Sequence, residues 1–160
     1  MNRSYKKFLS IIGIAFFLIF LASFQVSFIN SSFLNINLFL ILILYLVLTR
    51  NDSKALIFAW LGGILTGLSY FSNFGINSLV LLILTAILII LYKTVFLTLR
   101  TESILLISVI GVILYHFLNW LLTNGEFGLY FAGREILTEL ILTTLILLII
   151  FKIKTPQAVC

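Results

Sequence analysis

The sequence predicts an all-α membrane protein, a single bundle of six transmembrane helices with both termini on the cytoplasmic side. Hydrophobic residues make up 62% of the 160 residues and charged residues only 9%, whereas soluble domains carry about 25% charged residues. The hydrophobic residues fall into six runs, each near the roughly 20 residues that cross about 30 Å of hydrocarbon. Basic residues lie almost entirely on alternate connections between these runs, which is the pattern of cytoplasmic loops.

The first run, 8–29, follows the basic residues Arg3, Lys6 and Lys7. Its apolar part of about 22 residues is longer than the 7–15 residues of a signal-peptide core. Ala22-Ser23 is only a weak cleavage site. We therefore expect this segment to be kept as the first transmembrane helix.

The other five runs are joined by short connections. We expect a helix in each of them: 33–49, 55–71, 78–99, 104–122 and 136–151. They are continuously apolar rather than alternating, which indicates helices and not strands of a barrel. The second, third and sixth runs are short, so flanking residues or local thinning of the bilayer would have to compensate. Only the connection 123–135 has room for structure of its own, and residues 1–160 form a single domain.

The distribution of Lys and Arg predicts the orientation. Nine of the ten basic residues fall on one side of the predicted bundle, and only Arg134 falls on the other. Because basic loops stay in the cytoplasm, this pattern favours an even number of crossings. It also explains the net charge of +5 without nucleic acid as a partner. The nine are Arg3, Lys6, Lys7, Arg50, Lys54, Lys93, Arg100, Lys152 and Lys154.

The third run carries small residues at every fourth position, Ala55, Ala59, Gly63 and Gly67. Gly63 and Gly67 form a GxxxG motif. Such a face lets another helix backbone approach closely. It could pack against helices of the same chain, or against a partner protein or a second copy of this chain. The pattern alone leaves both uses open.

The polar residues of the last two runs suggest a site on the outer side. His116 and Asn119 are one turn apart near the end of the fifth run, and Glu139 lies about one turn inside the sixth. Ionisable groups within a membrane are costly and usually face the bundle interior. His116 and Glu139 could therefore pair and line a shallow outer pocket with Asn119. Alternatively, Glu139 reaches the lipid headgroups and His116 binds a backbone carbonyl group.

Catalytic and cofactor motifs are missing from the sequence. A lone His without Cys or clustered acids does not make a usual zinc site. There is no phosphate-binding loop, no dinucleotide-binding glycine pattern and no GxSxG turn. We therefore expect no enzymatic activity, no cofactor and no metal, with membrane lipids and other membrane proteins as the partners.

The stretch 35–120 resembles the family of the bacterial rod-shape-determining protein MreD. Asn37-Leu38 stands where that family often has Pro-Asn at the start of an early helix. The glycine-rich helix and the small-residue turn of the family correspond to two segments of this chain, 62–69 (GGILTGLS) and 72–77 (SNFGIN). Thr66 stands where an Asp is common in the family, and the proline is missing, so the role of that acidic residue is not carried over.

The resemblance implies a six-helix fold related to the substrate-binding S components of energy-coupling-factor vitamin transporters. It also implies a scaffold in the bacterial cytoplasmic membrane, with an MreC-like single-pass protein and other proteins of the cell-wall elongation machinery as partners. A vitamin-transporter S component is the alternative function, and would bind its substrate near His116, Asn119 and Glu139. Another small solute transporter is a further alternative.

Overall fold

The computed structural model describes residues 13, 16–24, 37–70, 75–95, 101–122 and 129–154, and every regular element in these residues is a helix. Residues 16–24 are helical within the expected first run, and the rest of that run, except Gly13, lies outside the described residues. The five helices that follow are α2 (Leu38–Leu48), α3 (Asp52–Tyr70), α4 (Ile76–Val95), α5 (Thr101–Leu122) and α6 (Leu129–Lys154).

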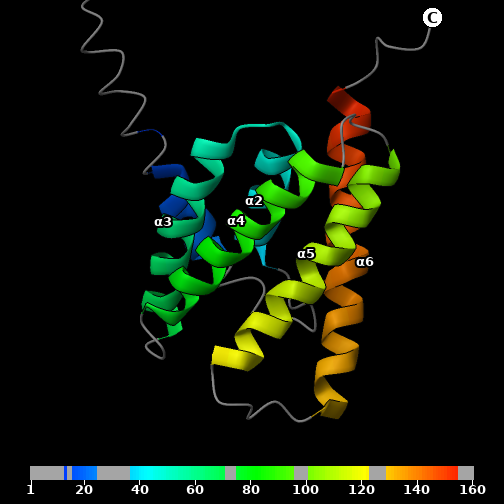
Figure 1. Ribbon diagram of the computed structural model, residues 1–160. Helices are drawn as coiled ribbons and strands as arrows, with labels where there is room; N and C mark the ends of the chain where they lie inside the picture. The colour runs from blue at the N-terminus through cyan, green and yellow to red at the C-terminus, as the bar shows by residue number, and fades with distance from the viewer. Residues whose placement is uncertain are drawn as a thin grey trace, which may run out of the picture.

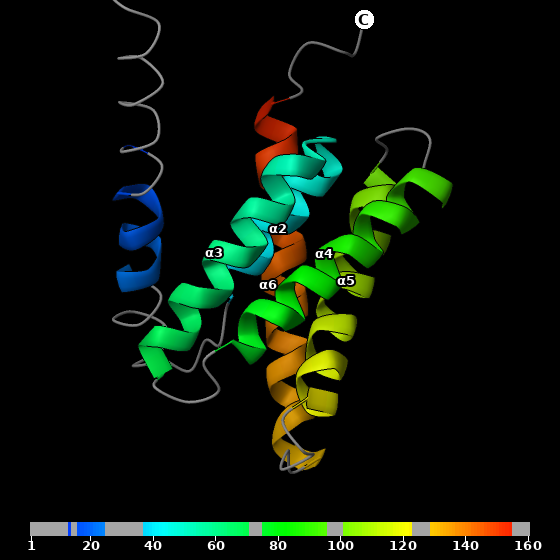
Figure 2. The same ribbon diagram turned by 60° about the vertical axis from the view of Figure 1, so that its left-hand side comes forward.

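The helix α2 lies at the centre of the bundle and contacts α3, α4, α5 and α6. Successive helices from α2 to α6 run in opposite directions, as Figures 1 and 2 show. Buried side chains occupy almost every position around α2 rather than one stripe, as expected for a helix surrounded by others. They are Phe39, Leu40, Ile41, Ile43, Leu44, Leu46, Val47 and Leu48.

Local backbone chemistry determines both ends of α2. At its start, the Asn37 side chain accepts a hydrogen bond from the backbone N–H of Leu40 at 3.2 Å, a typical N-cap. At its end, Arg50 has a φ of 57°, and the N–H groups of Arg50 and Asn51 donate to the carbonyls of Val47 and Leu46. This pair of bonds is a Schellman motif. It turns the chain directly into α3.

Among the residues that the structure describes, three helical segments are long and apolar enough to cross a membrane, namely Ile76–Val95, Thr101–Leu122 and Ile136–Ile153. The helix expected at 33–49 is shorter than predicted, because Asn37 is extended and α2 begins at Leu38. Its 11 residues extend only about 17 Å at 1.5 Å per residue. This helix therefore cannot cross about 30 Å of hydrocarbon by itself.

The other predicted boundaries shift by a few residues, most of all in the last helix. The prediction for that helix was 136–151, but α6 covers Leu129–Lys154, so part of the expected connection 123–135 is helical. Glu139 consequently lies ten residues inside its helix and not one turn from the start. The predictions 55–71, 78–99 and 104–122 correspond to α3, α4 and α5.

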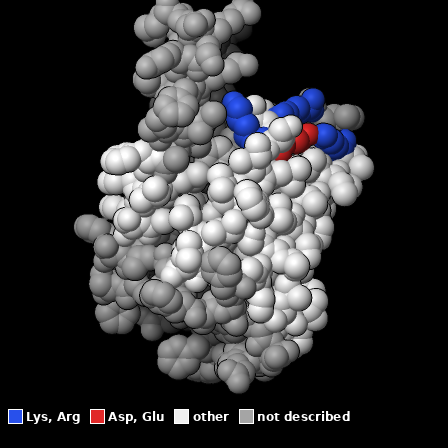
Figure 3. Space-filling model, turned by 90° about the vertical axis from the view of Figure 1, so that its left-hand side faces the viewer, with Lys and Arg blue, Asp and Glu red and all other residues white. Residues whose placement is uncertain are grey.

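Lys and Arg side chains gather at one end of the molecule (Figure 3). At this end α2, α4 and α6 finish and α3 and α5 begin (Figure 1). Arg50, Lys54, Lys93 and Lys152 belong to these helix ends. We refer to it below as the basic end.

Candidate functional site

A buried polar junction joins α2, α5 and α6. Nε2 of His116 on α5 lies 2.6 Å from Oε2 of Glu139 on α6. The other carboxylate oxygen of Glu139 accepts a hydrogen bond from the backbone N–H of Asn37 at 3.3 Å. Glu139 is only 3% exposed. Both of its carboxylate oxygens therefore have their hydrogen-bond partners inside the bundle.

The junction follows from local structure at each of its three residues. A helix start leaves four backbone N–H groups without intrahelical partners. In a capping box, the N-cap side chain takes one of these groups and a Glu of the first turn takes the N–H of the N-cap residue. Here Asn37 supplies the first bond and Glu139 supplies the second from a different helix. Since the N-terminus of a helix carries partial positive charge, it is a favourable neighbour for this carboxylate.

The sequence hypothesis that His116 and Glu139 pair agrees with this geometry, and the alternative in which Glu139 reaches the headgroups does not. Asn119 lies three residues beyond His116 on α5 and is half-buried. The proposed ligand-binding role of His116, Asn119 and Glu139 stays a prediction. In this structure His116 and Glu139 bind each other.

Two threonines follow Glu139 on α6 within about one and a half turns. The Oγ1 atoms of Thr143 and Thr144 are buried and have no hydrogen-bond partner in the part of the chain that the structure describes. Other threonines in this chain, such as Thr66 and Thr85, donate to a carbonyl one turn earlier in their own helix.

The small-residue face of α3 is buried against this chain's own helices. Ala55, Ala59, Gly63 and Gly67 are all buried. A Cβ atom added to Gly63 would lie only 2.2 Å from Cα of Ser78 on α4. The Ser78 hydroxyl also donates to the carbonyl of Trp60 at 3.2 Å. Gly63 therefore serves the packing of α3 against α4, the first of the two uses that the sequence left open.

Sequence reasoning missed the contacts at the basic end. Asp52 in the first turn of α3 forms an ion pair with Lys93 in the last turn of α4, with 2.5 Å between Oδ2 and Nζ. The Arg50 guanidinium lies 5.8 Å from the centre of the Tyr92 ring. The available signal was the short connection between the runs 55–71 and 78–99, because an antiparallel pair brings the start of one helix beside the end of the other.

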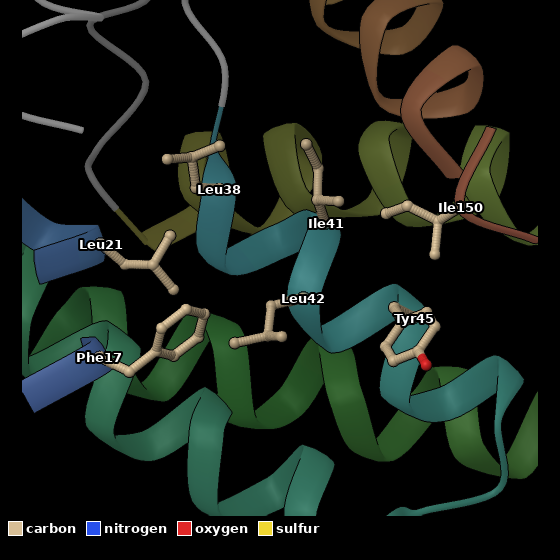
Figure 4. Close-up of a pocket in the computed structure, with 7 residues that line it drawn as sticks. All are labelled: Phe17, Leu21, Leu38, Ile41, Leu42, Tyr45 and Ile150. Carbon is tan, nitrogen blue, oxygen red and sulfur yellow. The ribbon is translucent and has the colours of Figure 1, made fainter. Parts of the chain in front are cut away.

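A second feature, which the sequence did not predict, is an apolar groove on the side of the bundle. Its volume is about 300 Å³. Phe17 and Leu21 form one side, Ile150 of α6 forms the opposite side, and one face of α2 lies between them (Figure 4). That face consists of Leu38, Ile41, Leu42 and Tyr45. The groove includes none of the residues predicted for the outer pocket.

No group of three or more His, Cys, Asp or Glu side chains that could hold a metal ion occurs in the described part of the chain. In comparisons with known proteins, no protein-family model matches the chain, and neither a curated protein nor a solved structure matches it.

Proposed function

We propose that this chain is a non-catalytic scaffold of the bacterial cytoplasmic membrane, similar to MreD, that acts through contacts with other membrane proteins of the cell-wall elongation machinery. One observation carries the proposal. The side chains of Glu139 and His116 are bound to each other inside the bundle, while the outward face of α6 is apolar from Leu137 to Ile153. Every fourth residue on that face is about half exposed or more: Leu137, Ile141, Leu145, Ile149 and Ile153.

This row of side chains, the α6 ridge, is suited to contact with another helix. Side chains four residues apart form a continuous ridge that fits into the groove of a neighbouring helix. The opposite face of α6 carries Glu139, Thr143, Leu147 and Phe151, which are buried within this chain. One face of α6 thus packs inside the bundle, and the opposite face points outward from it. The resemblance to MreD suggests an MreC-like single-pass protein as the partner.

The proposal includes six crossings with both termini in the cytoplasm. The common location of the helix ends that carry Arg50, Lys54, Lys93 and Lys152 supports this orientation, because basic residues mark the cytoplasmic side. Since α2 is too short to cross alone, it accounts for only part of the second crossing. The buried start of α2 is then acceptable in a membrane because Glu139 and the Asn37 side chain satisfy its N–H groups.

A vitamin-transporter S component is less well supported by the geometry. Such a subunit would bind its substrate through His116, Asn119 and Glu139 on the outer side. Glu139 instead uses one oxygen for His116 and the other for the Asn37 backbone. A ligand would have to displace both bonds to reach the carboxylate.

A photo-crosslinking experiment in bacterial cells tests the scaffold function. Benzoylphenylalanine is placed at Leu145 on the α6 ridge and, as a control, at Ile90 on the outer face of α4, which is 63% exposed. We expect Leu145 to capture a single-pass protein with a periplasmic coiled coil, identified by mass spectrometry after mild-detergent purification, and Ile90 not to capture it. Equal capture at both positions, or retention of a small polar solute in place of a protein, would contradict the scaffold function.

A further inference from the structure

The apolar groove is large enough to hold one hydrocarbon chain. The part of α2 that lines it runs from Leu38 to Tyr45, about 10 Å at 1.5 Å per residue. A volume of about 300 Å³ along that length leaves room for a row of carbon atoms, which pack about 4 Å apart.

The lining of the groove is also what an acyl chain requires. Of its seven side chains, six are purely hydrocarbon, and the Tyr45 hydroxyl is the one polar group. Phe17 and Leu21 face Ile150 across the α2 surface (Figure 4). Burial of apolar surface between these walls is worth about 25 cal/mol per Å² in water. In a bilayer that term is small, so close packing of the chain between the walls would provide the specificity.

The position of the groove along the bundle corresponds to one leaflet. The helix α2 extends about 17 Å from the polar junction at Asn37 to the basic end, a little more than half of the roughly 30 Å hydrocarbon thickness. Tyr45 lies toward the basic end of the groove, where aromatic residues with a polar tip are favoured at the membrane surface. A lipid lying along the groove would therefore have its headgroup at the basic end.

The charge at that end selects among headgroups. Arg50 follows α2 and Lys152 lies near the end of α6, and both residues are exposed. Lys54 and Lys93 belong to the same end, where Asp52 and Glu102 are the acidic residues of the described chain. The basic residues outnumber the acidic ones, and lysines near a membrane surface extend their charge to the headgroups. Basic clusters of this kind attract anionic lipids of the cytoplasmic leaflet.

We propose that the groove formed by Phe17, Leu21, Leu38, Ile41, Leu42, Tyr45 and Ile150 binds one acyl chain of an anionic phospholipid, with its phosphate group at the basic end. The assignment to the cytoplasmic leaflet rests on the proposed orientation, while the preference for an anionic headgroup depends only on the charges of this chain. Lipid binding here is distinct from partner binding at the α6 ridge.

Native mass spectrometry of the purified full chain in nanodiscs tests this site. The nanodiscs contain equal amounts of phosphatidylglycerol and phosphatidylcholine with identical acyl chains. We expect the protein to retain phosphatidylglycerol in preference, on the order of tenfold, from the attraction of basic side chains to anionic lipid. Leu42→Trp, which fills the groove, should lower the bound lipid several-fold. Ile141→Trp on the outer face of α6 should leave it unchanged.

A second measurement guards against misfolding of the Leu42→Trp variant. Phosphatidylglycerol with a photoreactive group on its acyl chain is incorporated with the wild-type protein, and labelled residues are mapped by peptide mass spectrometry. Labels concentrated on Phe17, Leu42 and Ile150 are expected. Equal labelling of the outer face of α4, no preference over phosphatidylcholine, or capture of a protein from a photoreactive residue at Leu42 would overturn the proposal. Because the purified protein contains no partner, this result is independent of the crosslinking from Leu145.

Discussion

Glu139 places a carboxylate in a part of the bundle where only 3% of the residue is exposed. An isolated charge in such surroundings would cost many kcal/mol, so its stability depends on the groups that contact it. His116 supplies one contact at 2.6 Å and the backbone N–H of Asn37 supplies the other at 3.3 Å. The carboxylate thereby ties α5 and α6 to the start of α2, 102 residues earlier in the chain.

Because His116 and Glu139 are paired, we expect substitutions of the two residues to have non-additive effects on stability. We expect His116→Ala to destabilise the protein by about 3–5 kcal/mol, because it leaves a buried carboxylate without its ionisable partner. Glu139→Gln should also be costly. The double variant should be less costly than the sum of the single variants by about 1 kcal/mol or more. Unfolding free energies in detergent measure these effects.

An exposed acidic residue on α5 provides the control. Glu102→Gln should change the unfolding free energy by less than about 0.5 kcal/mol, as surface substitutions usually do. If the effects of His116→Ala and Glu139→Gln were simply additive, the two side chains would not be coupled.

At the scale of elements, the α3–α4 pair is held together along its length by different kinds of contact. The ion pair of Asp52 with Lys93 lies at the basic end, where its exposure limits its contribution to about 1 kcal/mol or less. Near the other end, Gly63 lets the α4 backbone at Ser78 approach closely. Close approach maximises van der Waals contact between the helices, which is the main source of helix association in lipid.

We expect Gly63→Ala to weaken this pair. Alanine favours a helix by up to about 1 kcal/mol over glycine, but its Cβ atom would lie 2.2 Å from Cα of Ser78. Backbone atoms cannot move aside locally, so the helices would have to separate, at a cost of about 1–3 kcal/mol or more. The net effect should be destabilising, measured by thermal unfolding in detergent.

Gly13→Ala is the matched control, because the added Cβ would meet no atom within 4 Å beyond its own local backbone and chain neighbours. This substitution should be neutral or slightly stabilising. An unchanged or raised melting temperature for Gly63→Ala would show that α3 and α4 do not approach as closely as described.

At the scale of the whole molecule, a short central helix is enclosed by longer ones. The helix α2 covers only part of the length of the bundle, and its buried start is satisfied by Asn37 and Glu139. The outer faces of α4, α5 and α6 are rich in exposed Leu, Ile, Phe and Trp side chains. Such surfaces suit a hydrocarbon environment, and they are consistent with the three segments long enough to cross a membrane.

The proposed topology predicts the location of the chain's single cysteine, Cys160. A membrane-impermeant maleimide should label Cys160 only after cells are permeabilised, because six crossings return the C-terminus to the cytoplasm. In a Cys160→Ser background, Asn124→Cys should be labelled in intact cells. Labelling of Cys160 from outside would contradict the even number of crossings.

The sequence by itself determined the helical membrane class, the approximate position of each helix from α2 to α6 and the gathering of basic residues at one end. These features depend on hydrophobicity and charge, which are properties of local segments. It also suggested the pairing of His116 with Glu139, because unusual polarity stands out in an apolar run.

Only the tertiary structure decided where α2 starts, which groups bind the backbone N–H groups at that start, and where a groove remains open. The run 33–49 is apolar throughout apart from Asn35, Asn37 and Thr49, so hydrophobicity could not show that the helix begins at Leu38. The start depends on Glu139, 102 residues away in the chain. The groove depends on how closely residues 16–24 and α6 approach the same face of α2. Contacts between distant segments determine both features, and no local pattern records them.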